Sequence, residues 1–248
     1  LGWQISIGCL IDGDAPDIGG AVGIDRGVTV PLMLSDGTSY NLPASVSDLD
    51  RRIRKAQRVA SRRKRGSVRH AKAQRRVAAL RAKQARIRKH WAHEATTQIA
   101  RRYGTVVVER LRTKNMTASA SGTIAEPGRN VAQKRGLNRA ILNVGWHQIE
   151  TMLLYKAHRL VKVNPAYTSQ TCSACGTVDS RGRKNQARFA CPCCGFRANA
   201  DHNAAINILR RNTASMIVEE GHRLSVEAIT AQGVDPLGNL RPSGRGRC

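Results

Sequence analysis

Two cysteine pairs in the segment Cys172–Gly195, CSACGTVDSRGRKNQARFACPCCG, give the strongest indication of structure in the chain. Cys172 pairs with Cys175 and Cys191 with Cys194, each as Cys-x-x-Cys, and 15 residues separate the two pairs. Each pair allows two thiolates from one tight turn to reach the same ion, and four thiolates complete the tetrahedral shell of a structural Zn²⁺. The spacing therefore predicts a four-cysteine zinc ribbon.

The other residues around the two cysteine pairs also favour a zinc ribbon. Cys193 is a surplus thiol that could compete with Cys194, although the two-residue spacing favours Cys194. A pair of redox-active motifs is the alternative, but no thioredoxin-like pattern surrounds either Cys-x-x-Cys. Glycine follows each pair, at Gly176 and Gly195, and suits the turned backbone of a zinc knuckle.

The composition indicates one large globular domain, or a core domain with a small appendage. The chain has 248 residues, of which 41% are hydrophobic and 24% charged. Its 7 cysteines are an odd number, which fits a metal site in a reducing compartment better than a disulfide framework, so we expect a cytoplasmic protein. No apolar run approaches the roughly 18 to 20 residues that span a bilayer, so we expect no membrane partner.

A strong positive charge indicates a polyanionic partner. Lys and Arg number 42 against 17 Asp and Glu, a net charge of +25, and nucleic acid is the polyanion that such a surface favours. From Arg51 to His93 the chain has no acidic residue. Apolar residues repeat at helical spacing on both sides of a break at Gly66 and Ser67, which predicts a hairpin of two basic helices.

We expect this hairpin to contact nucleic acid. Without compensating glutamates its cations repel one another, and a polyanion would relieve that repulsion. A solvated helical face is the alternative, and anionic lipid is a weaker one because no bulky apolar face accompanies the charge. The predicted nucleic-acid-binding residues are Arg51, Arg52, Arg54, Lys55, Arg58, Arg62, Arg63, Lys64, Arg65, Arg69, Lys72, Arg75 and Arg76.

Three acidic residues stand at the ends of predicted core elements. Asp25 and Glu109 each end an apolar strand, and Asp201 opens a helix predicted over 201–210. Each alone could be a turn residue, a salt-bridge partner or a helix N-cap. Gathered together, their carboxylates would suit two Mg²⁺ ions, which activate water and stabilise the leaving oxygen of a phosphodiester.

The other core elements carry weaker signals. Asp36 and Gly37, between two apolar runs, predict a β-hairpin. An amphipathic helix is predicted over 137–159, followed by a strand over 160–163. The apolar stripe of that helix comprises Ile141, Leu142, Trp146, Ile149 and Leu153.

The remaining segments are expected to be termini and loops. We predict a strand over 1–11, a mobile loop over 114–136 and a disordered tail beyond Ala231. Because the chain opens on Leu within that first strand, we expect an N-terminal portion to be missing.

In combination these motifs resemble the TnpB family, the OrfB proteins of bacterial insertion sequences and relatives of type V CRISPR effectors. The likeness runs from about Trp3 to Arg211. It rests on GIDRG (23–27), VVVERL (106–111), PAYTSQTCSACG (165–176), CPCCG (191–195) and NADHNAAINI (199–208). The resemblance implies an α/β fold, an RNase H-like, RuvC-type mixed sheet with a basic helical-hairpin insertion and a four-cysteine zinc ribbon. It also implies RNA-guided cleavage of double-stranded DNA next to a short transposon-associated motif.

The resemblance assigns roles to matching positions. Asp25, Glu109 and Asp201 match the three catalytic carboxylates, which hold two Mg²⁺. The zinc ligands are matched by Cys172, Cys175, Cys191 and Cys194. Guide RNA and target double-stranded DNA are the implied partners, and Arg26 and Arg197 are candidate contacts to the scissile strand. The alternative, from a different class, is a zinc-ribbon nucleic-acid-binding remnant or regulator that does not cleave.

The implied domain order alternates nuclease segments with insertions. Residues 1–20 end an N-terminal barrel and linker, 21–47 form the first RuvC part, 48–102 the basic insertion, 103–166 the second RuvC part, 167–198 the zinc ribbon, 199–211 the third RuvC part and 212–248 a partly disordered tail. Family members usually carry a further N-terminal portion that handles guide RNA and the adjacent DNA motif.

Overall fold

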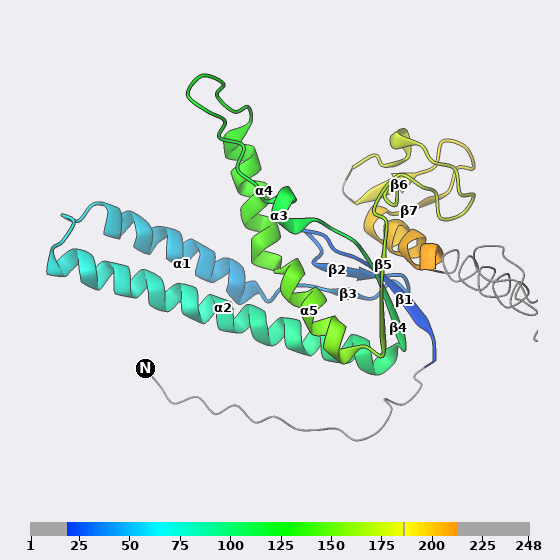
Figure 1. Cartoon of the computed structure of the whole chain (residues 1–248), viewed down its shortest axis with the longest axis horizontal. Helices are drawn as coiled ribbons and strands as arrows, with labels where there is room; N and C mark the ends of the chain where they lie inside the picture. The colour runs from blue at the N-terminus through cyan, green and yellow to red at the C-terminus, as the bar shows by residue number, and fades with distance from the viewer. Residues whose placement is uncertain (1–18, 186, 213–248) are drawn as a thin grey trace, which may run out of the picture.

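The computed structural model of the chain describes residues 19–185 and 187–212, which form a five-stranded sheet, a long helical hairpin and a small cysteine-rich module (Figure 1). The strands are β1 (Ala21–Asp25), β2 (Leu32–Leu34), β3 (Ser39–Tyr40), β4 (Thr105–Glu109), β5 (Arg159–Val163), β6 (Arg188–Ala190) and β7 (Arg197–Asn199). The helices are α1 (Ala44–Ser61), α2 (Val68–Arg102), α3 (Thr113–Met116), α4 (Val131–Val144), α5 (Trp146–Lys156) and the short 3-10 helix η1 (Ser180–Gly182). A last helix is described over residues 200–212.

The five-stranded sheet is mixed, with the order β3-β2-β1-β4-β5. β1 pairs in parallel with β4, and β4 with β5, while β2 and β3 add antiparallel strands at one edge. The turn between β2 and β3 lies at the predicted position, where Gly37 has a φ of 87° and the Asp36 side chain accepts a hydrogen bond from Thr38 N at 2.9 Å. The prediction of a mixed α/β core is confirmed.

One face of the sheet packs against α2, α4 and α5. Alternate residues of β1 and β4, including Ile24 and Val108, join Trp91 of α2 and Ile149 of α5 in one buried cluster. Because side chains alternate along a strand, the residues between them face the other way.

The opposite face packs against helix 200–212. Val107, Val163 and Ile208 form a separate buried cluster there. At Gly23 the helix comes so close to β1 that a Cβ atom would lie 2.3 Å from the Ala205 carbonyl oxygen. The sheet therefore lies between two helical layers, and the close approach to β1 requires a residue without a side chain.

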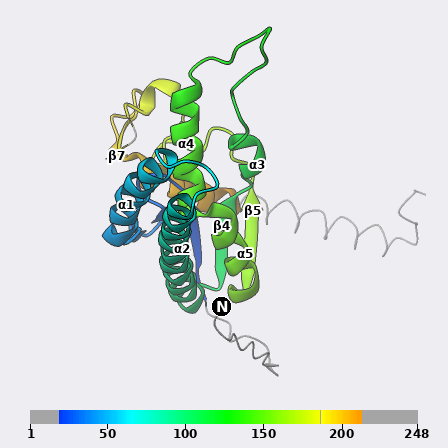
Figure 2. The same ribbon diagram turned by 90° about the vertical axis from the view of Figure 1, so that its left-hand side faces the viewer.

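The hairpin of α1 and α2 extends from the sheet, and Figure 2 shows the two helices side by side. The break between them falls at the predicted position, where Gly66 has a φ of 81° and the Ser67 side chain accepts a hydrogen bond from His70 N at 3.1 Å. Small residues, including Ala60 and Val77, form the buried seam between the helices. The predicted two-helix hairpin is therefore confirmed.

The predicted single helix over 137–159 is wrong. Gly145, with a φ of 76°, separates α4 from α5, and residue 159 already belongs to β5. The left-handed turn at Gly145 explains the error, because it ends α4 and a new helix starts after it. Of the five residues predicted on the apolar stripe, Leu142 is 64% exposed, and the other four belong to the buried cluster against the sheet. The predicted loop 114–136 also differs, since most of α3 and the start of α4 lie within it.

Two predictions fall outside the described residues. They are the strand over 1–11 and the disordered tail beyond Ala231.

The contact at Gly23 predicts the effect of adding one methyl group. Gly23→Ala places Cβ against main-chain atoms of Ala205 and Leu209, at 2.3 and 2.6 Å, so the helix must move. We expect a loss of about 1 to 3 kcal/mol in the free energy of unfolding, measured by urea denaturation. Gly136→Ala in α4 is the control, because a Cβ there meets nothing within 4 Å, and it should gain about 0.5 to 1 kcal/mol. Equal effects at both positions would contradict the close packing.

Candidate functional site

Asp25 and Glu109 are the last residues of two neighbouring parallel strands, β1 and β4. Gly23 and Val107, two residues earlier on each strand, face helix 200–212. Because side chains alternate along a strand, both carboxylates lie on that same side of the sheet, at its carboxyl edge. The strand geometry thus brings together two acids that are 84 residues apart in the sequence.

Asp201 reaches the same edge from the first turn of helix 200–212. The cap of this helix is Asn199, whose Oδ1 accepts hydrogen bonds from the main-chain nitrogens of Asp201 at 2.9 Å and His202 at 3.1 Å. The Asp201 carboxylate therefore does not act as the helix cap, which was the simplest explanation of its position in the sequence. It accepts a hydrogen bond from Arg183 Nη2 at 3.1 Å.

The three carboxylates influence one another electrostatically. Burial, then the negative charges of Glu109 and Asp201, raise the pKa of Asp25 to about 7. Burial also raises the pKa values of Glu109 and Asp201, and the positive charge of Arg183 opposes the rise at all three groups. Three acids of this kind, two of them buried and Asp25 half-buried, are unfavourable together unless positive charge neutralises them.

The donor set suits a hard divalent cation, since carboxylate oxygens are preferred ligands of Mg²⁺. The carboxylates form a looser group than the cysteines. The ligand atoms of the four cysteines all lie within 4.8 Å of one another. The three carboxylates do not meet this criterion in the described residues, 19–185 and 187–212. The structure thus brings Asp25, Glu109 and Asp201 to one edge, and their role as metal ligands stays a prediction.

Glu109 is held through both its side chain and its main chain. Thr168 Oγ1 donates a hydrogen bond to Glu109 Oε1, and Arg26 Nη2 donates to the Glu109 carbonyl oxygen. Arg26 also forms an ion pair with Glu150 of α5, with 2.7 Å between Nη1 and Oε2, and its side chain is only 1% exposed. This buried pairing argues against the contact to DNA expected for Arg26, whereas Arg197 is exposed on β7.

Arg183 is the cation that the sequence did not single out. It follows η1 inside the cysteine-rich module and forms an ion pair with Asp201. One arginine among 42 basic residues carries no local signal, so only the folded chain reveals its position beside the acids.

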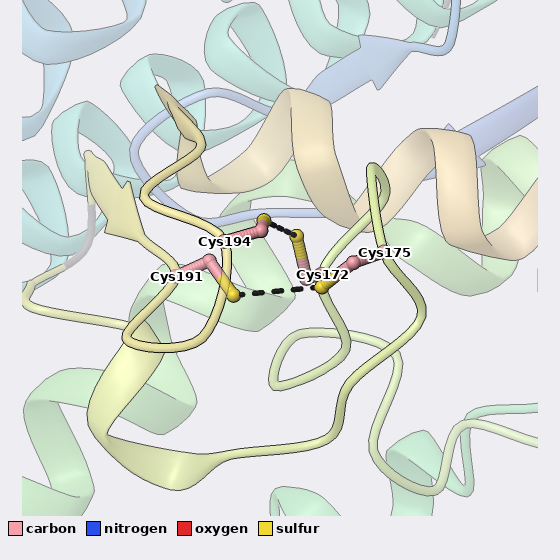
Figure 3. A group of neighbouring side chains, drawn as sticks. All are labelled: Cys172, Cys175, Cys191 and Cys194. Carbon is pink, nitrogen blue, oxygen red and sulfur yellow. Dashed lines mark hydrogen bonds between the residues drawn. The ribbon is translucent and has the colours of Figure 1, made fainter.

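The four predicted cysteines converge on one point (Figure 3). Cys172 Sγ lies 3.7 Å from Cys194 Sγ, and Cys175 Sγ lies 3.7 Å from Cys191 Sγ. A tetrahedral ion with metal–sulfur bonds of about 2.3 Å requires sulfur–sulfur separations of about 3.8 Å. The group therefore has the size of a metal site, and Cys193 is exposed outside it.

Two similar turns build this cysteine group. Gly176 N bonds to the Cys172 carbonyl oxygen at 2.9 Å, and Gly195 N bonds to that of Cys191 at 3.1 Å. The two glycines have φ values of 77° and 73°, so the predicted need for glycine after each pair is confirmed. Hydrogen bonding with Thr177 lowers the pKa of the Cys175 thiol to about 6, which favours the thiolate form that binds metal.

The basic hairpin presents its cations to solvent. All thirteen arginines and lysines predicted to bind nucleic acid are exposed. Six of them, Arg52, Lys55, Arg63, Arg69, Lys72 and Arg76, line a groove of about 540 Å³ between α1 and α2. This arrangement allows the hairpin to contact a polyanion. That the polyanion is nucleic acid stays a prediction.

Fold and site define an α/β protein with two groups of metal-type ligands, four clustered cysteines and three acids at the edge of the sheet. Residues 13–120 match the family model "Probable transposase" (OrfB_IS605), and residues 146–208 match the "Cas12f1-like, TNB domain" model. The chain belongs to the TnpB/OrfB family of insertion-sequence proteins, as its motifs predict.

Several curated proteins and solved structures are similar to this chain. A protein of Escherichia coli K12 named "Putative RNA-guided DNA endonuclease InsQ" is 37% identical, and the match covers 83% of this chain and 53% of that protein. A "Putative RNA-guided DNA endonuclease" of Streptomyces pristinaespiralis is 32% identical, with coverage of 84% and 49%. Among solved structures, a Cas12f1-sgRNA-target DNA complex matches with a TM-score of 0.48 and 25% identity, over 80% of this chain and 51% of that one.

The chain thus spans about half the length of the curated relatives that it matches. No helix among the described residues is long and apolar enough to cross a membrane.

The cysteine geometry predicts which thiols bind metal. Cys194→Ser should weaken binding of the ion and lower the unfolding temperature, because three thiolates leave the fourth position of the tetrahedral shell to water. Cys193→Ser is the matched control and should keep roughly one zinc ion per chain by metal analysis, since Cys193 lies outside the group. The reverse pattern would show that Cys193 is the ligand.

The raised pKa of Asp25 predicts a pH-dependent stability. The folded protein holds this proton up to about pH 7 and the unfolded chain only to about 3.8, so stability falls as the pH rises between these values. In magnesium-free buffer at pH 8, Asp25→Asn should raise the free energy of unfolding by up to about 4 kcal/mol, and much less at pH 4.

Asp179→Asn provides the control for this measurement. A hydrogen bond from Arg181 lowers the pKa of the half-buried Asp179, so removing its charge should give no gain at pH 8. Urea denaturation at both pH values measures the difference. A similar gain in both variants would mean that general charge, and not burial at the carboxylate site, causes the effect.

Proposed function

We propose that the chain is the nuclease part of an RNA-guided DNA endonuclease of the TnpB type, with a RuvC-like, RNase H-like core. The observation that carries this proposal is the meeting of Asp25, Glu109 and Asp201 at one edge of the sheet, where burial and then the two other acids raise the pKa of Asp25. Buried acids with raised pKa values are typical of functional sites, because folding alone gains nothing from them. The printed names of the relatives in Escherichia coli and Streptomyces pristinaespiralis support the same activity.

Asp25, Glu109 and Asp201 would hold two Mg²⁺ ions. When bound, these ions supply an activated water and stabilise charge on the phosphodiester. The residues of the chain position this chemistry: Thr168 holds the Glu109 side chain and Arg183 balances the negative charge at Asp201.

The cysteine group would hold a structural Zn²⁺. Four thiolates leave no open position for water, which supports a structural role over a catalytic one. Reduced thiols of this kind are maintained in the cytoplasm, where we place the protein.

The basic hairpin would hold guide RNA and target double-stranded DNA through phosphate contacts. Aromatic residues make up only 4% of the chain, so backbone charge and duplex shape suit this surface better than base stacking. On this proposal residues 21–47, 103–166 and 199–211 are the nuclease segments, 48–102 is the basic insertion and 167–198 is the ribbon.

DNA cleavage by the chain co-expressed with its flanking genomic RNA tests the function. With Mg²⁺ we expect cutting of labelled double-stranded DNA, and Asp201→Asn should reduce the rate at least about 100-fold while DNA binding persists. Asp179→Asn is the control and should cut normally, because Asp179 pairs with Arg181 on the ribbon and not with the three acids. Binding without cutting, both by this chain and by a version extended with upstream sequence, would favour the non-cleaving remnant.

A further inference from the structure

Thr168 joins the segment before the first cysteine pair to the carboxylate group. Its side chain is buried, with 2% of the residue exposed, and its hydroxyl donates a hydrogen bond to Glu109 Oε1. The Pro165 carbonyl oxygen, 3.0 Å from the hydroxyl oxygen, is a second acceptor for the same proton. A hydrogen bond to one carboxylate oxygen limits rotation of the group and so fixes the direction of its remaining lone pairs. Thr168 is therefore placed to set the orientation of Glu109.

Thr168 is itself held by the helix that carries Asp201. Asn207 Nδ2 donates to the carbonyl oxygens of Thr168 at 3.0 Å and Thr171 at 2.7 Å. Asn203 Nδ2 donates to the Thr171 carbonyl oxygen at 2.8 Å, and both asparagines are buried. The backbone around Thr168 is thus fixed to helix 200–212 by side chains that have little freedom to move.

The residue before Thr168 has an unusual backbone. Tyr167 has a φ of 61°, which bulky side chains rarely adopt, and its side chain is exposed. Its carbonyl oxygen accepts hydrogen bonds from Gln170 N at 3.0 Å and Thr171 N at 2.9 Å. Strained conformations persist only where the surroundings enforce them, and here the result is that Thr168 lies inside while Tyr167 lies outside.

We propose that Thr168 is a positioning residue that orients Glu109 for divalent-cation binding and links the cysteine module to the carboxylate site. This inference rests on the proposed function, because it assumes that Glu109 is a metal ligand. Groups that hold a ligating carboxylate commonly change metal affinity about 10- to 100-fold when they are removed. Thr168 would act through Glu109 and would not touch the cation.

Binding of Mn²⁺ to the zinc-loaded 248-residue chain, measured by electron paramagnetic resonance, tests this role without requiring cleavage. Thr168→Val keeps the shape and removes the hydroxyl, so Mn²⁺ affinity should fall about tenfold, while zinc content is retained. Thr168→Ser restores the donor and should bind as the native chain does. Asp201→Asn identifies the signal, because Mn²⁺ at the carboxylate site should be lost in that variant.

Thr171→Val is the matched control on the same segment. Its hydroxyl donates to the Tyr167 carbonyl oxygen at 2.8 Å and not to a carboxylate, so Mn²⁺ affinity should be unchanged. Equal affinity of the Thr168→Val and native chains, or equal losses at both threonines, would overturn the inference. If Thr168→Val does not fold, Thr168→Ala measured against Thr168→Ser makes the same comparison.

Cleavage by the same variants separates this inference from the proposed function. Weaker Mn²⁺ binding in Thr168→Val, in a chain that never cuts DNA, would support the inference and contradict the nuclease. If the native chain cuts DNA and the Thr168→Val variant binds Mn²⁺ and cuts equally well, the result would support the nuclease and contradict the inference about Thr168.

Discussion

The close contact between helix 200–212 and β1 at Gly23 sets the geometry of the whole site. Because a Cβ at Gly23 would collide with main-chain atoms, the helix lies directly against the strand. Its first turn then stands at the carboxyl edge of β1 and β4, which brings Asp201 to Asp25 and Glu109. A bulkier residue at position 23 would separate the acids without altering any of them.

The same arrangement has an electrostatic cost. Desolvation raises the pKa of each of the three acids, and at Asp25 the neighbouring negative charges add to the effect. Arg183 offsets part of this cost at all three carboxylates, and the charges of Arg26 and Arg211 offset part of it at Glu109, yet burial still leaves each of the three pKa values raised. A fold selected only for stability would have a neutral or apolar group in place of one acid, so this cost fits the proposal that the acids bind a cation.

Local sequence patterns predicted most of the helices, strands and turns. Contacts between residues far apart in the sequence, which only the folded structure reveals, could not be predicted. Glycines after each cysteine pair and the break at Gly66 are visible in the sequence because short-range geometry requires them. The acids at the strand ends are visible because each directly follows an apolar run. The prediction of one long helix was wrong because of Gly145. A single glycine within a helical pattern of apolar residues does not reveal a left-handed turn. Thr168 and Arg183 could not be identified because their partners, Glu109 and Asp201, are 59 and 18 residues away.

The path of the chain makes the cysteine module part of the carboxylate site rather than an independent appendage. Thr168, before the first cysteine pair, bonds to Glu109; Arg183, between the pairs, bonds to Asp201; and Asp201 itself follows the second pair. The module thus contacts the acids where it begins, in its middle and where it ends. A metal ion that fixes the four cysteines would restrict all three connections at once, because the chain between them is short. Order at the thiolate site therefore contributes to order among the carboxylates, although the two groups share no ligand.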